Sequence, residues 1–306
     1  MAKTIGKRLL VMIPVMIGIT LLIFFIISLT PGDPGRLILG PMATEAEVQY
    51  LNAQLGFDRP FFVRFFDYLT SLAVGDFGRS FTTNLPVLEV IGSRMPVTLT
   101  LTFYSIMLTV LVSLPIGIYS AIKQYSLMDG ASILMAILLA AMPVFWLGLI
   151  LILTFSLRLQ WFPATGAEGF RSFVLPTITM AAGTIAVITR MTRTTMLSVI
   201  REDYIRSAMA KGASQWQIIT RHALRNALIP VVTLLGINFG TMLGGTVLVE
   251  NVFGMPGIGA LLVDAIRMKD EPVVLGCVII LALFFCLINL LVDISYAYID
   301  PRLRHK

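Results

Sequence analysis

The chain has 306 residues, of which 57 % are hydrophobic and 13 % charged, and its formal net charge is +6. A soluble globular domain carries about 25 % charged residues, so this composition excludes a soluble protein and indicates an integral membrane protein. Basic residues in a membrane chain usually record its orientation, so the positive charge does not predict nucleic-acid binding. The two cysteines, Cys277 and Cys286, lie in one apolar run and are too few for a disulfide framework or a metal site.

Six apolar runs without charge approach or exceed the length needed to cross about 30 Å of hydrocarbon. They cover residues 9–29, 97–122, 131–157, 173–189, 228–249 and 272–292. The fourth run is the shortest, and we expect its helix to continue past Arg190 to residue 193. Prolines 115, 143 and 176 lie inside these runs and can kink the helices. The sequence predicts a single all-α transmembrane domain, residues 1–306, with six transmembrane helices.

The distribution of Lys and Arg predicts the orientation. Of the 23 basic residues, 14 lie in the short segments 1–8, 123–130, 190–227 and 293–306. Because cytoplasmic segments are enriched in Lys and Arg, these segments are predicted to be cytoplasmic, together with both termini. The excess of positive charge is then explained by topology.

The connection 30–96 is too long for a turn and is predicted to be extracytoplasmic. After Pro60, its residues Phe61, Phe65 and Leu69 recur at helical spacing, with Phe62 and Phe66 beside them. A short amphipathic helix lying in the headgroup region would explain this pattern. The pattern favours this interpretation, and the alternative is a cap that meets an extracytoplasmic partner.

The second long connection contains residues 201–227, which we call the polar segment. Gly212 can adopt the left-handed conformation that ends a helix. Ser214 and Gln217 have the spacing of a capping box, so a short helix is expected to begin at Gln215, before the next span near Pro230. With Trp216 and Ile219 on one side, and Arg221 and Arg225 elsewhere, this helix could enter a groove on a soluble protein. It could also lie on the membrane, anchored by the tryptophan and the arginines.

The last two runs carry small and polar residues. Gly236, Gly240 and Gly244 recur every four residues, a spacing that lets helices approach closely, within this chain or against a partner chain. Asn238 could line a pathway or hydrogen-bond across helices. Asn289 and Asp293 lie one turn apart at the inner end of the last run, where they could be structural or form part of a proton relay.

The polar segment resembles the cytoplasmic signature of ABC importer permeases, a loop that docks into the ATP-hydrolysing subunit. In an alignment on Gly212, only Ala208, Gly212 and Leu224 match the general form of the signature. The peptide and nickel permeases depart from that form in the same way, and the stretch AKGASQWQIITRHALRNALIP is similar to theirs, in the first-permease type. Further landmarks of this family lie in the expected order: Gly32-Asp33-Pro34, Gly75 to Gly78, Ser80-Phe81, Phe253 to Gly259 and Asn289 to Arg302.

The resemblance implies the type I ABC importer permease fold in a bacterial or archaeal cytoplasmic membrane. It also implies a second, similar permease chain, two ATPase subunits and an extracytoplasmic substrate-binding protein as partners. The residues implied to couple this chain to the ATPase are Ala208, Gly212, Ala213, Ser214, Gln215, Trp216, Ile219, His222, Leu224 and Arg225. ATP and Mg²⁺ are expected on the ATPase subunits, since this chain has no Gly-rich phosphate loop; no cofactor, metal or catalytic residue is expected in it.

Di- or oligopeptides are the expected substrates, and nickel, glutathione or another small solute is the alternative. A membrane-embedded enzyme is disfavoured because the two histidines, His222 and His305, are far apart and no GxSxG motif occurs. A secondary transporter driven by an ion gradient would need charged groups at membrane depth, whereas five of the six spans have none and the sixth has none before Asp293.

Overall fold

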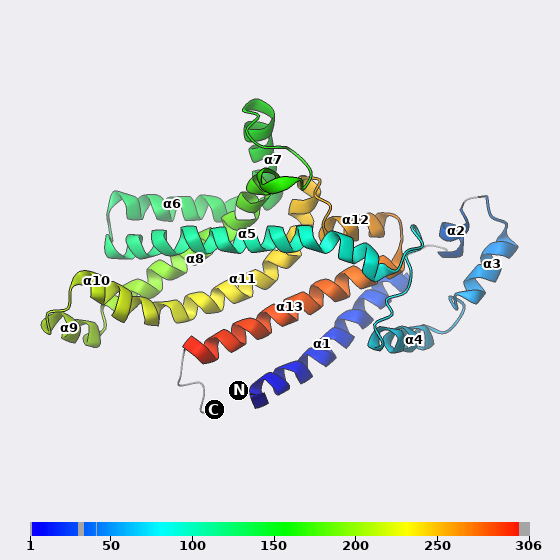
Figure 1. The fold of residues 1–306 in the computed structure, drawn as a ribbon, viewed down its shortest axis with the longest axis horizontal. Helices are drawn as coiled ribbons and strands as arrows, with labels where there is room; N and C mark the ends of the chain where they lie inside the picture. The colour runs from blue at the N-terminus through cyan, green and yellow to red at the C-terminus, as the bar shows by residue number, and fades with distance from the viewer. Residues whose placement is uncertain (1, 30–33, 41, 300–306) are drawn as a thin grey trace. The chain divides into compact units, whose positions relative to one another are not determined.

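The computed structural model describes residues 2–29, 34–40 and 42–299. Over these residues the chain is helical and forms no strand, apart from an isolated bridge between Arg79 and Pro86. The elements are α1 (Ala2–Leu29), α2 (Pro34–Leu39), α3 (Glu45–Gln54), α4 (Phe61–Ala73), α5 (Val87–Ile122), α6 (Leu127–Ala141), α7 (Val144–Leu151), the π-helix η1 (Ile152–Arg158), α8 (Gly169–Ile200), α9 (Asp203–Ala210), α10 (Gln215–Gln217), the π-helix η2 (Ile218–Ala223), α11 (Leu224–Val252), α12 (Ile258–Arg267) and α13 (Glu271–Ile299). Figure 1 shows them in chain order.

The predicted all-helical membrane fold is confirmed. In the described part of the chain, five helical stretches are long and apolar enough to span a membrane, within α1, α5, α8, α10 to α11, and α13. A sixth span exists if α6 and the α7–η1 helix are counted together, and these two are bent by 104° relative to each other. The membrane-spanning helices therefore number five or six.

The bend corrects the prediction of one continuous helix over 131–157. α6 ends at Ala141, Met142 has an extended backbone (ψ 126°), and α7 begins after Pro143. Proline lacks a backbone N–H and disfavours the helical conformation of the residue before it, which accounts for the break. Pro176 lies inside α8 without ending it, so a proline by itself does not determine where a helix is interrupted.

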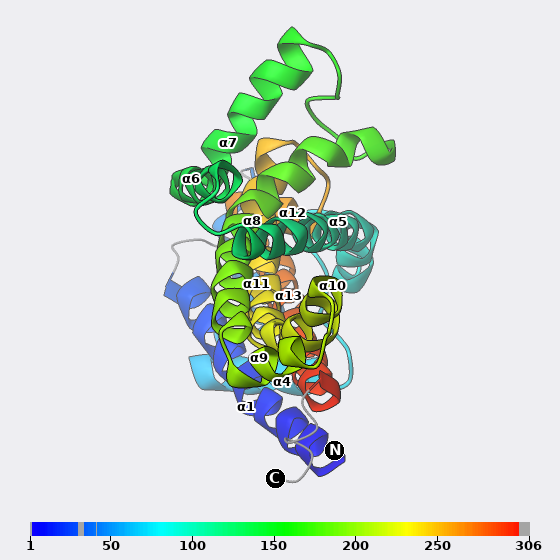
Figure 2. The same ribbon diagram turned by 90° about the vertical axis from the view of Figure 1, so that its left-hand side faces the viewer.

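The chain forms two compact units, which we describe separately. Unit 1 comprises residues 1–5, 99–255 and 285–306. Its central element is α8, which contacts α6, α7 and α11 (Figures 1 and 2). α5 approaches α8 closely at Gly117, where a Cβ atom would lie 2.6 Å from Cβ of Thr192. Only glycine permits this distance, so the sequence of α5 fixes its contact with α8.

Unit 2 comprises residues 6–98 and 256–284. Its core is formed by buried residues from α5, α12 and α13, among them Ile91, Ile258 and Cys277. The helix predicted after Pro60 is confirmed as α4, which turns Phe65 and the half-buried Phe61 toward Phe24 of α1. The hydrophobic effect thus holds one face of α4 against α1, while Phe62 and Phe66 remain exposed.

One of the landmark stretches, Ser80-Phe81, is held in place in unit 2 by a residue outside the landmarks. The buried carboxylate of Asp270 accepts hydrogen bonds from the hydroxyl of Ser80 (2.5 Å) and from the backbone N–H groups of Phe81 (3.1 Å) and Thr82 (3.2 Å). This carboxylate fixes the loop before α5 to the turn before α13. The landmark at Gly32 and Asp33 lies outside the described residues.

Candidate functional site

The polar segment folds as a helix, a glycine turn and a second helix. α9 ends at Ala210, and Gly212 has a positive φ of 83°, as expected for the residue that reverses the chain. The hydroxyl of Ser214 accepts a hydrogen bond from the N–H of Gln217 (3.3 Å), whose side chain in turn accepts one from the N–H of Ser214 (3.1 Å). The predicted capping box and the helix start at Gln215 are confirmed.

The second helix does not end before the next span, which corrects the prediction of a separate short helix. α10 continues through η2 into α11, and Pro230 lies inside α11. Ile218, Ala223 and Ala227 are buried along this stretch, so packing on one continuous face outweighs the hydrogen bond that Pro230 cannot make. The helix that carries Trp216 is therefore continuous with the membrane-spanning helix α11.

One face of the polar segment packs on the chain itself. Ile205 of α9 and Ile218 of η2 are buried in a cluster with Ala121 of α5 and Met196 of α8. Ile219, predicted with Trp216 to face a partner, is half-buried against this cluster, and its role in docking stays a prediction. Ala213 and Leu224 pack against the same cluster.

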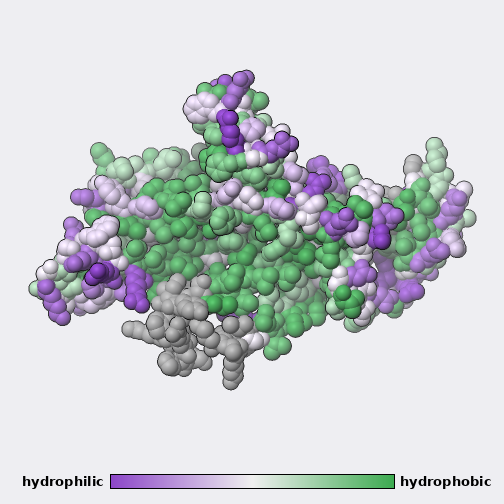
Figure 3. Space-filling model, viewed as in Figure 1, coloured by the Kyte–Doolittle hydropathy of each residue, from purple (hydrophilic) through white to green (hydrophobic). Residues whose placement is uncertain are grey.

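Other side chains of the polar segment are exposed and available to a partner. The side chain of Trp216 is 74 % exposed, and Tyr204 and Met209 are also exposed. Among the remaining candidates, Ser214, Gln215 and Arg225 are exposed, whereas Ala208 and His222 are half-buried. Figure 3 shows hydrophilic residues gathered over α9 and α10. A hydrogen bond from Asn226 to the hydroxyl of Tyr204 (2.8 Å) ties α9 to α11.

The glycines of α11 differ in their surroundings. A Cβ atom on Gly236 would overlap Val292, and one on Gly240 would overlap Phe285, so both glycines admit the last helix of the same chain. Gly244 has no such neighbour within 4 Å among the described residues. Of the two alternatives left open by the sequence, contact within the chain therefore holds for Gly236 and Gly240.

The polar residues of the last two spans bond to their own helices. The amide of Asn238 donates to the carbonyl of Leu234 (2.8 Å), and that of Asn289 donates to the carbonyl of Phe285 (2.8 Å). The side chain of Asp293 lies outside the described part of the chain, so its role stays a prediction.

Sequence reasoning missed a polar network at the start of α6. Asp129 is buried and accepts two hydrogen bonds from Arg193 of α8, from Nε at 2.6 Å and from Nη2 at 2.8 Å. The hydroxyl of Ser120 and the N–H of Tyr125 (2.9 Å) also donate to this carboxylate. A bidentate guanidinium–carboxylate pair is among the strongest polar contacts in proteins. It joins α5, α6 and α8 at the end of unit 1 that carries Ala121 and Met196 of the buried cluster.

A local signal for part of this network exists in the sequence. Ser126 caps α6 by accepting a hydrogen bond from the N–H of Asp129 (3.2 Å), and a serine three residues before an acidic residue is a typical helix start. The partner Arg193 is 64 residues away, and no local pattern predicts the pairing.

Comparisons with known proteins place the chain in a family. Residues 113–305 match the binding-protein-dependent transport system inner membrane component family, and residues 1–102 match the N-terminal family of the same membrane components. The chain is 42 % identical over 306 residues to the glutathione transport system permease protein GsiC of Salmonella choleraesuis, and 41 % identical to that of Escherichia coli strain K12. Each comparison covers 100 % of both chains.

Two solved structures have the same fold. One is the inward-facing MetNI methionine ABC transporter, with a TM-score of 0.58, 20 % identity and coverage of 70 % of this chain and 97 % of the other. The second is an amino acid ABC transporter crystallised with histidines, with a TM-score of 0.52, 16 % identity and coverage of 70 % and 94 %. This chain belongs to the binding-protein-dependent transport system inner membrane component family, and it is a permease subunit of an ABC importer of the peptide and nickel type.

Proposed function

We propose that this chain forms half of the translocation pathway for short peptides, with glutathione as the first cargo to test. A second, similar permease chain supplies the other half, two ATPase subunits carry ATP and Mg²⁺, and a binding protein delivers the cargo from outside. The support for the cargo is full-length similarity to proteins whose names specify glutathione transport. The chain is oriented with both termini and the polar segment in the cytoplasm, as the distribution of basic residues favours.

The observation that carries the coupling role is the construction of the polar segment. A glycine turn and a capping box fix the orientation of exposed Trp216, and the helix that carries it continues into a membrane span. Movement of an ATPase groove around Trp216 is then transmitted directly to α11. Rigid elements with few internal joints transmit such displacements efficiently.

The test is ATP hydrolysis by the assembled importer in liposomes, with binding protein and glutathione or α-linked peptides added in turn. Wild type is expected to hydrolyse ATP faster when its cargo is present. Gly212→Val is expected to return the rate to the unstimulated level while the chain still inserts, because a β-branched residue is strained at φ 83° and displaces Trp216. Stimulation that survives in this variant would contradict the coupling role of the turn.

Gly75→Val is the matched control. Gly75 also has a positive φ, of 82°, and open space around its Cα, but it lies in unit 2. The Gly75→Val substitution introduces similar backbone strain away from the polar segment, so ATP hydrolysis in this variant is expected to remain stimulated by the cargo. Equal loss in both variants would indicate general destabilisation.

A further inference from the structure

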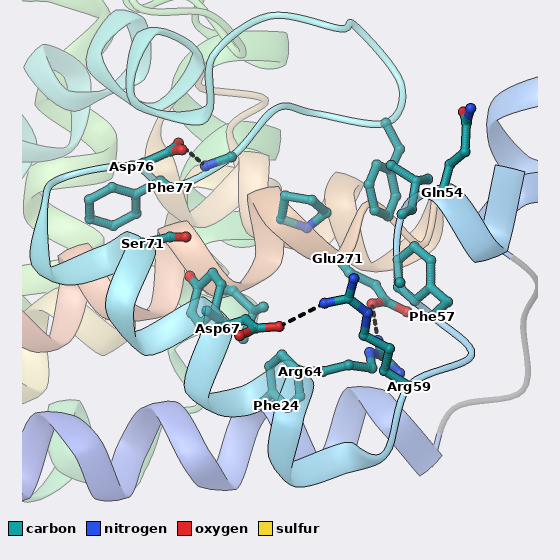
Figure 4. A pocket seen from close by; sticks show the side chains of 17 residues that line it. Phe24, Gln54, Phe57, Arg59, Arg64, Asp67, Ser71, Asp76, Phe77 and Glu271 are labelled. Atoms are coloured by element: carbon teal, nitrogen blue, oxygen red, sulfur yellow. Dashed lines mark hydrogen bonds and ion pairs between the residues drawn. The ribbon is translucent and has the colours of Figure 1, made fainter.

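Unit 2 contains a pocket that the coupling mechanism does not use. Its volume is about 340 Å³, and it is lined by α1, α4, the start of α13 and the loops around residues 54–59 and 76–81 (Figure 4). Five of its lining residues are aromatic: Phe24, Phe57, Tyr68, Phe77 and Phe81. Two Arg side chains and three carboxylates also line it, so the pocket combines apolar surface with charges of both signs.

One pair of charges in this pocket is loosely joined. Nη2 of Arg64 lies 3.9 Å from a carboxylate oxygen of Glu271, and the two side chains are 22 % and 26 % exposed. Hydrogen bonds between such groups are about 2.7–2.9 Å long, so this contact is an ion pair without a hydrogen bond. A guanidinium can donate five hydrogen bonds and a carboxylate can accept about four. Both groups therefore keep hydrogen-bonding capacity toward the pocket.

Aromatic rings hold Arg64 in place. Its guanidinium carbon lies 4.6 Å from the ring centre of Phe57 and 5.6 Å from that of Phe24, distances typical of cation–π contacts. Arg59, beside it in Figure 4, differs because it already donates a hydrogen bond to Asp67 (3.3 Å). Among the described residues, Arg64 therefore donates no hydrogen bond, whereas one donor of Arg59 is taken up by Asp67.

The hydroxyl of Tyr68 is a further group in this pocket whose hydrogen-bonding capacity is not used within the described residues. This hydroxyl is buried and has no hydrogen-bond partner among the residues that the structure describes. Burial raises its pKa well above the ordinary value, so the hydroxyl keeps its proton and remains a donor at neutral pH. A buried polar group without a partner is energetically unfavourable, and a ligand that accepts this hydrogen bond would offset that cost.

We propose that this pocket binds an α-amino acid head group, an ammonium and a carboxylate attached to one carbon. The carboxylate lies on the free edge of the Arg64 guanidinium, the ammonium lies on the free oxygens of Glu271, and the rest of the ligand packs against the aromatic wall. Adjacent protein charges of opposite sign match adjacent ligand charges of opposite sign.

The geometry distinguishes ligands that are close chemical relatives. An ordinary α-linked peptide carries its ammonium and carboxylate at opposite ends, so it cannot place both on neighbouring groups. A γ-glutamyl peptide such as glutathione keeps both charges on one carbon, as does the serine head group of phosphatidylserine. The choice of glutathione as the soluble ligand rests on the proposed function, whereas the head-group chemistry rests on the pocket alone.

The test compares glutathione with its α-linked isomer in titration calorimetry. The protein is the importer complex without binding protein, in nanodiscs of phosphatidylglycerol. Glutathione is expected to bind at least about tenfold more tightly than the isomer, because in the isomer two further carbons separate the ammonium from the nearest carboxylate, so the two charges fit the adjacent Arg64 and Glu271 groups less well. Arg64→Gln and Glu271→Gln are each expected to weaken glutathione binding by about tenfold or more and to abolish the difference between the isomers.

Arg79→Gln is the matched control, since Arg79 lies in the same unit and donates a hydrogen bond to the carbonyl of Asn84, but does not line the pocket. It is expected to leave glutathione affinity within about twofold of wild type. Equal affinity for the two isomers would overturn the proposal, as would unchanged binding in Arg64→Gln and Glu271→Gln. Glutathione-stimulated ATP hydrolysis with the binding protein would still report on the proposed function, so the two failures are separable.

A further measurement in a different lipid identifies the source of the head group. In nanodiscs that contain phosphatidylserine, weaker apparent binding of glutathione would show that the lipid competes for the pocket. Unchanged affinity would assign the pocket to the soluble ligand. Absence of glutathione binding, together with no enrichment of phosphatidylserine in purified wild type over Glu271→Gln, would overturn the proposal.

Discussion

The two units each contain an arginine–carboxylate pair, and the pairs differ in how fully their hydrogen bonds are used. In unit 1, Asp129 receives two hydrogen bonds from Arg193, and the side chains are 3 % and 19 % exposed. In unit 2, Arg64 and Glu271 are 3.9 Å apart and somewhat more exposed. In the first pair, which we call the closed pair, the two side chains hydrogen-bond to each other. In the second, which we call the open pair, both side chains keep donors and acceptors that can bond to a ligand.

This difference separates a structural pair from a binding pair. Burying charges costs several kcal/mol, which a fully hydrogen-bonded geometry offsets and a loose geometry does not. The closed pair therefore fixes the ends of α5, α6 and α8 beside the cluster that supports the polar segment. The open pair contributes little to folding, and its unused capacity is directed to a ligand.

The largest effect is expected for Asp129→Asn. The substitution leaves the buried end of Arg193 without its counter-charge, so the free energy of unfolding should fall by about 3 kcal/mol. Thermal unfolding in detergent, followed by tryptophan fluorescence, measures the change. Asp203→Asn is the control because its pair with Arg206 is exposed (74 % for Arg206 and 96 % for Asp203), and its effect should stay below about 0.5 kcal/mol. Equal losses in the two variants would show that the buried pair contributes no more to the free energy of unfolding than the exposed pair does.

A smaller effect is expected for Arg193→Lys. Lysine keeps the charge but cannot form the two parallel N–H bonds that Nε and Nη2 make with Asp129. The expected loss is about 1–2 kcal/mol in the same unfolding measurement. Arg206→Lys, in the exposed pair, serves as the control and should be close to neutral. A neutral Arg193→Lys would indicate that charge alone, without bidentate geometry, holds this end of unit 1.

The features that could be predicted from the sequence are local ones. The capping box joins Ser214 to Gln217 within a single turn, and Gly212 directly precedes it, so the start of the helix was visible in the residue pattern. The same holds for α4, whose aromatic spacing follows Pro60. Apolar length likewise predicted the long helices, because a bilayer imposes that length on any span.

The features that were missed depend on contacts between distant residues. Asp129 and Arg193 are 64 residues apart, and nothing near Asp129 marks its partner. The burial of Ile219 and the continuation of η2 through Pro230 result from packing against Ala121 and Met196, which lie on other helices. Pro143 and Pro176 look alike in sequence, yet only Pro143 breaks a helix, since tertiary contacts decide the outcome.

The smallest change in stability is expected for Glu271→Gln. The Arg64 contact is an ion pair at 3.9 Å without a hydrogen bond, so removing the charge should change the free energy of unfolding by less than about 1 kcal/mol. The effect should appear instead in ligand dependence: the same glutathione concentration should raise the unfolding temperature of wild type more than that of this variant, because stabilisation by a ligand depends on its affinity for the folded state. A loss as large as that of Asp129→Asn would mean that the unit 2 pair is also structural, and the contrast between a closed and an open pair would fail.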